Sequence, residues 1–567
     1  MLMKKSKWLA LAGVSLLSVG VLVACSSKSN TSSNTYNYVY TADPETLDYL
    51  ISNKGSTTDA VTNGVDGLLE NDKYGNLVPS IAKDWTVSAD GLTYTYKLRK
   101  GVKWYTSDGE EYAEVTAKDF VTGLKHAADK KTESIYLAKD SVVGLADYFN
   151  GTDKDFSKVG VKALDDYTLQ YTLKQPEPYW NSKLTYSVTW PVNGDFLKSK
   201  GKDFGKSTDP TSILYNGPYL LKALTTKSSI EFTKNENYWD KDHVYFDNIK
   251  LTYDDGSDQE SLERNFTDGV YNLARLFPTS SNYSKVEKQY KDNIFYTQPG
   301  SAVEGVGINI DRQTYGHTSK ENDQQKTSTK TALLNKDFRQ SLGFAIDRTN
   351  YAAQLNGKEG GSTAVRNIFV KPDFVQADGK DFGTMVMDQL PAYGDEWSGV
   401  NLADSQDGLY NPEKAKAEFA KAKEALQAEG VQFPIHLDVP VNQSSKITVN
   451  QVQSIKQSVE SALGKDNVVL DIHQLSADDF NNITYSASNA AAEDWDLSVG
   501  VAWDPDYLDP STYLDVLKTT SSENTKSFMG YDDPNSQAVQ KVGLKEYDQL
   551  VEDASKETTD LKVRYEK

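Results

Sequence analysis

The sequence predicts a mixed α/β protein with more than one domain. Strand patterns with period-two alternation and helical patterns with capping signals follow one another along the whole chain, without a repeat of about 20–50 residues. The chain has 567 residues, of which 38% are hydrophobic and 11% aromatic. The apolar content is enough to build large buried cores, and the length exceeds that of one ordinary domain.

The chain begins with a lipoprotein-type export signal. Three lysines precede an uncharged apolar run, residues 8–24, and a lipobox at Leu22–Cys25 ends it. Cys25 is the only cysteine, and its acylation would supply two or more lipid chains, enough for stable anchoring. We therefore predict a signal peptide over residues 1–24 and lipidation of Cys25.

The alternative is a helix that stays in the membrane. The apolar run is short for a span of about 20 residues, and no basic stop-transfer cluster follows it. Residues 25–35 are instead rich in Ser, Asn and Thr, a composition typical of a flexible tether. We expect a protein anchored by lipid to the outer face of a bacterial membrane.

Strand and turn signals dominate the first half of the chain. Residues 93–98 alternate with period two after an Asp-Gly turn. Thr116 is expected to cap a helix, with Asp119 at the third helical position as its capping-box partner. Further strands are predicted at residues 36–40, 161–173, 229–234 and 248–253.

Helical signals are more frequent in the second half. Asn411 and Pro412 begin a helix that ends at Gly430, with Asn411 as its cap. Residues 314–330 are polar and are predicted to form a surface loop. The other predictions are helices over 338–351, 448–463 and 550–567, and strands over 434–441 and 468–473.

Composition and missing motifs exclude several classes of function. The net charge of −20 disfavours nucleic acid and anionic lipid as partners. The single cysteine excludes a disulfide framework and a cysteine-based zinc site. Motifs of zinc proteases, P-loops, dinucleotide-binding folds and serine hydrolases are absent, and the five histidines are not paired at metal-ligand spacing. We expect no catalytic residue, no metal and no cofactor.

Four groups of motifs, spread over almost the whole mature chain, carry a family resemblance. They are Asp43–Asp48; Pro79–Trp85 continuing through Gly91 and Trp104 to Phe120; Asn216–Leu220 with Lys234–Trp239; and Asp337–Leu342 with Ala345–Arg348. In order and spacing they resemble the family 5 solute-binding proteins of ABC importers, the oligopeptide-binding class. Val65–Asp72 and Asp509–Leu514 are similar to the streptococcal Ami/Ali type of oligopeptide-binding lipoprotein.

The resemblance implies a two-lobed, periplasmic-binding-protein-like α/β fold of type II, cluster C. Its first lobe carries an extra subdomain, and ligand is buried between the lobes as they close about a hinge. The implied boundaries are residues 36–60 and 186–290 for the core of lobe I, 61–185 for the extra subdomain and 291–530 for lobe II. Residues 531–567 would return to lobe I; relatives are longer there, so we expect this chain to be truncated in that lobe.

The resemblance also implies the ligand-binding residues. In the family, an aspartate just before a tyrosine clamps the α-ammonium of the peptide, and the matching residue is Asp506. By residue type alone, Asp504 or Asp509 could equally be the clamp. The backbone-binding residues implied are Gly500, Val501 and Ala502, with Asn53, Lys54 and Gly55 as the partner segment on lobe I. Trp503 and Tyr507 are expected to line side-chain pockets.

The implied function is a monomeric receptor that passes oligopeptides to the permease subunits of an ABC importer in a Gram-positive bacterium. Strand addition suits many peptide sequences, because the affinity comes from backbone hydrogen bonds that every peptide can form. Each of these bonds contributes about 0.5–1.5 kcal/mol. The alternatives are a receptor of the same fold for a nickel chelate, haem or sugar, a surface hydrolase, and a lipoprotein that senses peptides without importing them. Few histidines argue against a metal ligand, and the missing nucleophile motif argues against a hydrolase.

Overall fold

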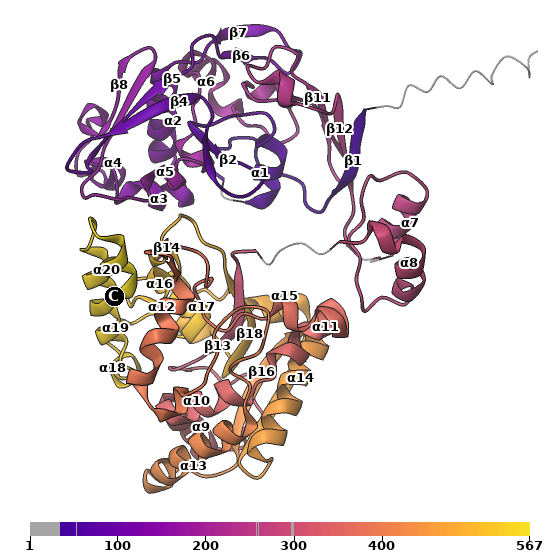
Figure 1. Cartoon of the computed structure of the whole chain (residues 1–567), viewed down its shortest axis with the longest axis vertical. Coiled ribbons are helices and arrows are strands. Elements are labelled where there is room, and N and C mark those ends of the chain that lie inside the picture. Colours follow the sequence, from indigo (N-terminus) through magenta and orange to yellow (C-terminus); the bar gives the residue numbers. More distant parts are fainter. Residues whose placement is uncertain (1–33, 53, 257, 259, 296–299) are drawn as a thin grey trace, which may run out of the picture.

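The computed structural model describes residues 34–52, 54–256, 258, 260–295 and 300–567. The described chain forms two lobes, one above the other in Figure 1. We call residues 34–253 the first lobe and residues 300–567 the second lobe. The predicted signal peptide, Cys25, nearly all of the tether and Asn53 lie outside the described residues. Within the described ranges, no helix is long and apolar enough to cross a membrane.

A four-stranded sheet brings the two ends of the first lobe together. Its order is β1-β12-β11-β10, with β1 parallel to β12 and the other neighbours antiparallel. Because β1 and β12 come from opposite ends of the lobe, their pairing closes the chain between them into one unit. The strands are β1 (Thr35–Tyr40), β10 (Tyr219–Thr225), β11 (Ser229–Lys234) and β12 (Asn248–Tyr253).

The chain between β1 and β10 carries a second, antiparallel sheet of order β4-β5-β9-β8. In β5, Tyr94, Tyr96 and Leu98 are buried on one face, as period-two alternation requires. The predicted capping box is confirmed at α2, where the Thr116 amide donates to the Asp119 carboxylate at 3.0 Å. Both sheets border one continuous hydrophobic core.

The remaining elements of the first lobe are short and surround these sheets. The strands are β2 (Leu69–Asn71), β3 (Leu77–Pro79), β4 (Ala82–Val87), β5 (Thr93–Leu98), β6 (Lys103–Tyr105), β7 (Glu111–Glu114), β8 (Val161–Asp165) and β9 (Thr168–Thr172). The helices are α1 (Gly55–Val61), α2 (Ala117–Asp129), α3 (Tyr136–Lys139), α4 (Leu145–Asn150), α5 (Trp180–Lys183) and α6 (Gly194–Lys200). Helices α1, α3 and α5 lie on the side that faces the second lobe (Figure 1).

The second lobe is built around two strand pairs. The parallel pair β16–β17 packs with α9, α13 and α14 over an apolar core, and the antiparallel pair β13–β18 adjoins it. The strands are β13 (Val303–Ile308), β14 (Gln376–Ala377), β15 (Lys380–Asp381), β16 (Ile435–Asn442), β17 (Val468–Leu475) and β18 (Leu497–Trp503).

Helices cover these strand pairs and include the end of the chain (Figure 1). They are α9 (Asp323–Leu334), α10 (Lys336–Ala345), α11 (Arg348–Gly360), α12 (Phe382–Gln389), α13 (Pro412–Ala428), α14 (Lys446–Leu463), α15 (Ala477–Asn482), α16 (Ser511–Leu514), α17 (Ser522–Met529), α18 (Gln537–Lys541), α19 (Leu544–Ser555) and α20 (Leu561–Glu566). Between the lobes, α7 (Ser261–Thr267) and α8 (Tyr283–Tyr290) form a lateral segment.

Three predictions differ from the structure. The helix predicted over residues 338–351 is two helices, because Asp347 interrupts it and caps α11 by accepting the Asn350 amide at 2.8 Å. The predicted loop 314–330 contains the start of α9, which Asn322 caps. Helices α18–α20 pack on second-lobe elements and do not form the predicted return of residues 531–567 to lobe I.

A buried carboxylate, Asp66, joins two motifs of the first lobe. It accepts hydrogen bonds from the Tyr238 hydroxyl at 2.8 Å and the Trp239 indole at 3.2 Å. Burial raises the pKa of Asp66 to about 7, although these hydrogen bonds lower it. Because the ordinary value is 3.8, the folded protein binds this proton more tightly than the unfolded chain does.

We predict that Asp66→Asn makes stability less dependent on pH. In the wild type, ionisation of Asp66 reduces the free energy of unfolding as the pH rises from about 4 to about 7, by up to about 4 kcal/mol. Asparagine keeps an oxygen that can accept from Tyr238 and Trp239 and has no charge to bury. Urea unfolding at several pH values measures this slope. Parallel curves for the two proteins over this range would contradict the assignment.

Candidate functional site

The second half of β18 leaves one edge free for another strand. β18 pairs antiparallel with β13, and among the described residues this ladder has only two strands. Gly500 is the extra residue of a bulge in the ladder, with a φ of +90° that favours glycine. Leu497, Ser498 and Val499 are buried, whereas Gly500 and Ala502 are exposed. The predicted backbone-binding residues therefore lie where the strand leaves the core.

A buried ion cluster holds the start of β18 in the second lobe. Arg312 contacts Asp438 at 2.7 Å, Asp494 at 2.8 Å and Asp496 at 3.0 Å. The Lys320 ammonium contacts both Asp438, at 2.7 Å, and Asp496. Burial acts to raise the pKa of Asp438, but hydrogen bonds from His473 and Lys320 and the charge of Lys320 hold it well below its usual range. Asp438 lies on β16 and Asp494 and Asp496 directly precede β18, so the cluster joins the two strands.

Asp506 lies beyond the end of β18, against the first lobe. The Tyr136 hydroxyl of α3 donates to the Asp506 carboxylate at 2.8 Å, and the Asp506 amide donates to the Thr512 hydroxyl at 2.8 Å. The Tyr186 hydroxyl is 3.5 Å from the Pro505 carbonyl oxygen. Two first-lobe tyrosines thus meet the segment that the sequence marked as the ligand clamp.

The three candidate carboxylates have different electrostatic surroundings. Asp509 is buried and is bound by Arg564 through two hydrogen bonds, at 2.7 and 2.8 Å. Asp504 is exposed and accepts from the Ser301 hydroxyl at 3.1 Å. Asp506 is half-buried and forms no ion pair within the described chain. Burial raises the pKa of Asp506, the Tyr136 hydrogen bond lowers it, Asp504 raises it and Lys183 lowers it.

These surroundings favour Asp506 over Asp504 and Asp509, which residue type alone left as alternatives. The charge of Asp509 is already neutralised by Arg564, and that of Asp504 is solvated. Asp506 combines partial burial with the absence of a basic partner among described residues, an arrangement that a bound cation would relieve. A primary ammonium group is such a cation.

The other predicted site residues are divided between the first lobe, the second lobe and the part of the chain outside the described residues. Lys54 precedes and Gly55 begins α1, on the side of the first lobe that faces the second lobe. Trp503 packs with the apolar cluster around Val303, Val370 and Tyr513, and its buried indole nitrogen has no hydrogen-bond partner among the described residues. Asn53 and Cys25 lie outside the described residues.

Tyr507 contacts the first lobe. Its ring stacks on that of Tyr179, with centroids 4.8 Å apart and an interplanar angle of 18°. The Leu508 amide donates to the Ser182 hydroxyl at 3.0 Å, next to this stack. No local sequence pattern marks Tyr136, Tyr179 or Ser182 as members of a site.

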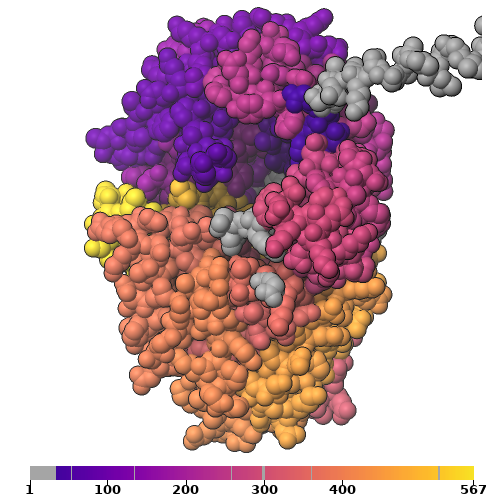
Figure 2. All heavy atoms as spheres, turned by 45° about the vertical axis from the view of Figure 1, so that its right-hand side comes forward, coloured from indigo at the N-terminus to yellow at the C-terminus, as the bar shows by residue number. Residues whose placement is uncertain are grey.

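The surface is hollowed between the lobes, beside the lateral segment (Figure 2). Asp506 lies between the lobes, because its carboxylate accepts from Tyr136 of the first lobe a few residues after β18 ends. No group of three or more potential metal ligands occurs among the described residues. The arrangement can offer unpaired backbone groups and one carboxylate to an extended ligand that has a terminal cation.

The sequence is similar to a family of bacterial binding proteins over most of its length. Residues 76–525 match the model for bacterial extracellular solute-binding proteins, family 5 Middle. The chain is 68% identical to the oligopeptide-binding protein AmiA of Streptococcus pneumoniae, over 100% of this chain and 86% of that protein. It is 60% identical to the oligopeptide-binding protein AliA of the same organism, with the same coverage.

Solved structures show the same fold. An oligopeptide ABC transporter substrate-binding domain from Bacillus anthracis aligns with a TM-score of 0.65 and 24% identity, over 94% of this chain and 89% of that one. OppA of Listeria monocytogenes, bound to peptide, aligns with a TM-score of 0.61 and 22% identity, over 92% and 91%. At these identities the likeness concerns the fold alone, and it confirms the predicted fold class.

We predict that Lys320→Met lowers the free energy of unfolding by about 3–5 kcal/mol. The change removes one of two cations from buried aspartates and leaves their charge uncompensated. Lys326→Met is the matched control, because Lys326 pairs with the exposed Asp323 and should cost less than about 1 kcal/mol. Urea denaturation measures both. Equal stability of the two variants would show that the cluster does not anchor β18.

Proposed function

Because this chain belongs to the bacterial extracellular solute-binding proteins of family 5, we propose that it binds oligopeptides between its lobes and delivers them to an ABC importer. Family membership makes it a binding protein rather than an enzyme, as predicted from the missing motifs. The named relatives are oligopeptide-binding proteins, which supports this ligand class.

One observation carries the proposal. Asp506 is a half-buried carboxylate without a basic partner among the described residues, and it lies beyond a strand with a free edge. A peptide has the complementary features, namely an α-ammonium and a backbone that can extend as a strand. The ammonium would pair with Asp506 and supply the missing cation, while backbone amides and carbonyls would pair along Gly500–Ala502.

This mode of binding tolerates many peptide sequences. Every peptide has the backbone groups and the terminal ammonium, and each backbone hydrogen bond contributes about 0.5–1.5 kcal/mol. The side chains of an added strand point alternately to the two faces of the sheet and take no part in the backbone hydrogen bonds, so they need space rather than specific partners. Lys54 and Gly55, at the start of α1, are proposed to contact the peptide from the first lobe.

We also propose that a lipid anchor holds the protein at the membrane. The family is extracellular, and the lipobox at Leu22–Cys25 supports attachment through lipid on Cys25. A receptor tethered beside the permease subunits stays at a high local concentration, because the tether limits how far it can diffuse. We propose that the protein acts as a monomer at the outer face of a Gram-positive cell membrane.

We predict that Asp506→Asn weakens binding at least about 30-fold. The test peptide is a hexapeptide with a free N-terminus, selected from a random-sequence pool by co-purification with the wild-type protein. Loss of one partner of a desolvated charge pair costs about 2–5 kcal/mol. Isothermal titration calorimetry measures the Kd, and Asp504→Asn, which changes an exposed carboxylate, should alter it less than about threefold.

The N-acetylated form of the same hexapeptide completes a double-mutant cycle. Acetylation should weaken binding to the wild type about as much as Asp506→Asn does, because both remove the same charge pair. Acetylation should then have little further effect on Asp506→Asn. If acetylation weakens both proteins equally, Asp506 does not bind the α-ammonium. If no hexapeptide is retained, the proposed function fails.

We predict that Cys25→Ala releases the protein from the membrane. The variant has no thiol to acylate, so most of the protein should move from the membrane fraction to the culture medium. Immunoblotting of the two fractions measures this distribution. Membrane retention equal to that of the wild type would contradict anchoring through Cys25.

A further inference from the structure

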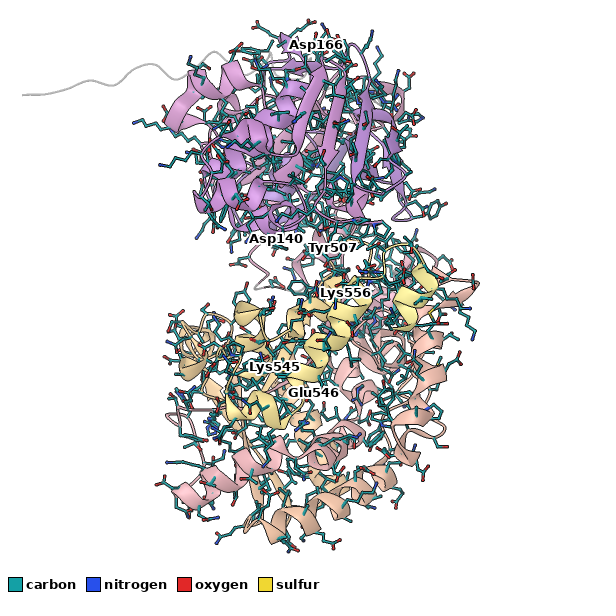
Figure 3. All side chains as sticks on the ribbon, turned by 90° about the vertical axis from the view of Figure 1, so that its left-hand side faces the viewer. Asp140, Asp166, Tyr507, Lys545, Glu546 and Lys556 are labelled. Atoms are coloured by element: carbon teal, nitrogen blue, oxygen red, sulfur yellow. The ribbon has the colours of Figure 1, made fainter. Side chains whose placement is uncertain are left out.

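The lobes meet at a stack of two tyrosines. Tyr179 precedes α5 of the first lobe, and Tyr507 follows Asp506 in the second lobe; their ring centroids are 4.8 Å apart. Tyr507 is a second-lobe side chain that packs against the hydrophobic core of the first lobe. Figure 3 places Tyr507 at the boundary between the lobes.

A buried cation lies against both rings. The Lys183 ammonium is 4.7 Å from the ring centroid of Tyr507 and 5.2 Å from that of Tyr179. Lys183 is 7% exposed and donates to Glu177 and Ser141, each at 3.0 Å, so its position is fixed within the first lobe. A cation over an aromatic face attracts the ring more strongly when water is excluded.

The second-lobe side of the contact is also held. Arg564 binds Asp509 through two hydrogen bonds, and its guanidinium carbon is 5.6 Å from the ring centroid of Tyr179. The Asp509 amide donates to the Tyr507 carbonyl at 2.9 Å, and the Tyr507 hydroxyl donates to Asp515 at 3.3 Å. Tyr507 is therefore held by groups of both lobes.

The stack and the clamp carboxylate belong to one short segment. Asp506 and Tyr507 share a peptide bond, and the Leu508 amide is bound by Ser182 of the first lobe. Separation of the Tyr179 and Tyr507 rings would carry Asp506 away from Tyr136. The position of Asp506 therefore depends on a contact that lies beside the ligand site.

We propose that Tyr179, Lys183 and Tyr507 form a tyrosine latch in which Tyr179 is a positioning residue. The latch holds Asp506 against the first lobe and so sets the lifetime of a bound peptide. Closure would then depend on the subdomain that carries Tyr179 as well as on contacts with the ligand. This inference rests on the proposed function, because it concerns release of the same peptide.

A double-mutant cycle between Tyr179 and Tyr507 tests the latch. Tyr179→Leu and Tyr507→Leu should each increase the koff of a fluorescently labelled hexapeptide about tenfold, which corresponds to about 1.4 kcal/mol. The double variant should also release it about tenfold faster, because both changes remove one interaction. Stopped-flow fluorescence measures koff and kon, and kon should stay within about twofold.

Tyr179→Phe is the matched control. The Tyr179 hydroxyl donates no hydrogen bond within the described chain, and phenylalanine keeps the ring, so release should occur at the wild-type rate. Thermal unfolding of each variant should stay near that of the wild type, which separates loss of the latch from loss of the fold.

Three results would overturn the inference. If the wild type binds peptide and Tyr179→Leu does not change koff, or if the double variant multiplies the two single effects to about 100-fold, the latch fails and the receptor function stands. If the wild type binds no hexapeptide, the proposed function fails, and the latch inference fails with it.

Discussion

Arg312 and Lys320 share three buried aspartates at the start of β18, and the arrangement of the candidate site depends on this cluster. A buried charge without a partner costs several kcal/mol, so each member holds the others in place. The cluster joins β16 to the residues that precede β18. Because that end of β18 is fixed, the residues that follow its other end can reach the first lobe from a strand whose register is set.

Two aspartates that follow β18, Asp506 and Asp509, differ in whether a cation neutralises their charge. Asp509 is paired with Arg564 and has a structural role. Asp506, three residues earlier, has only neutral hydrogen-bond partners within the described chain and is half-buried. Asp506 therefore differs from Asp504, which is exposed, and from Asp509, whose charge Arg564 neutralises. The same sequence segment therefore contains an ion pair that holds the chain and a charge that a ligand can satisfy.

Local sequence patterns predicted much of the fold because they depend on residues close together in the chain. Strands β5, β11 and β12 have the predicted bounds, and Thr116 and Asp119 form the predicted capping box. The helix over residues 338–351 was overextended because Asp347 can serve either as a helical residue or as a cap. Residues 314–330 are polar for two different reasons, and neither is that the whole segment is a surface loop. Lys320 is charged because it pairs with buried aspartates, and the start of α9 is polar because one face of that helix is exposed to solvent.

The candidate site could be predicted only in part. The family resemblance predicted Asp506 as the clamp, whereas the different surroundings of Asp504, Asp506 and Asp509 depend on the positions of Ser301, Tyr136 and Arg564. Tyr136 is 370 residues from Asp506 in the sequence, and Ser182 is 326 residues from Leu508. Contacts at such separations leave no local pattern, so the tyrosine latch became visible only in the folded chain.

Native mass spectrometry of the protein expressed from Ser26 onward, without added ligand, tests the central claim most directly. We expect a spread of adducts whose released masses sequence as peptides with free N-termini, and Asp506→Asn should lose them. A single non-peptide adduct that survives Asp506→Asn would contradict the account.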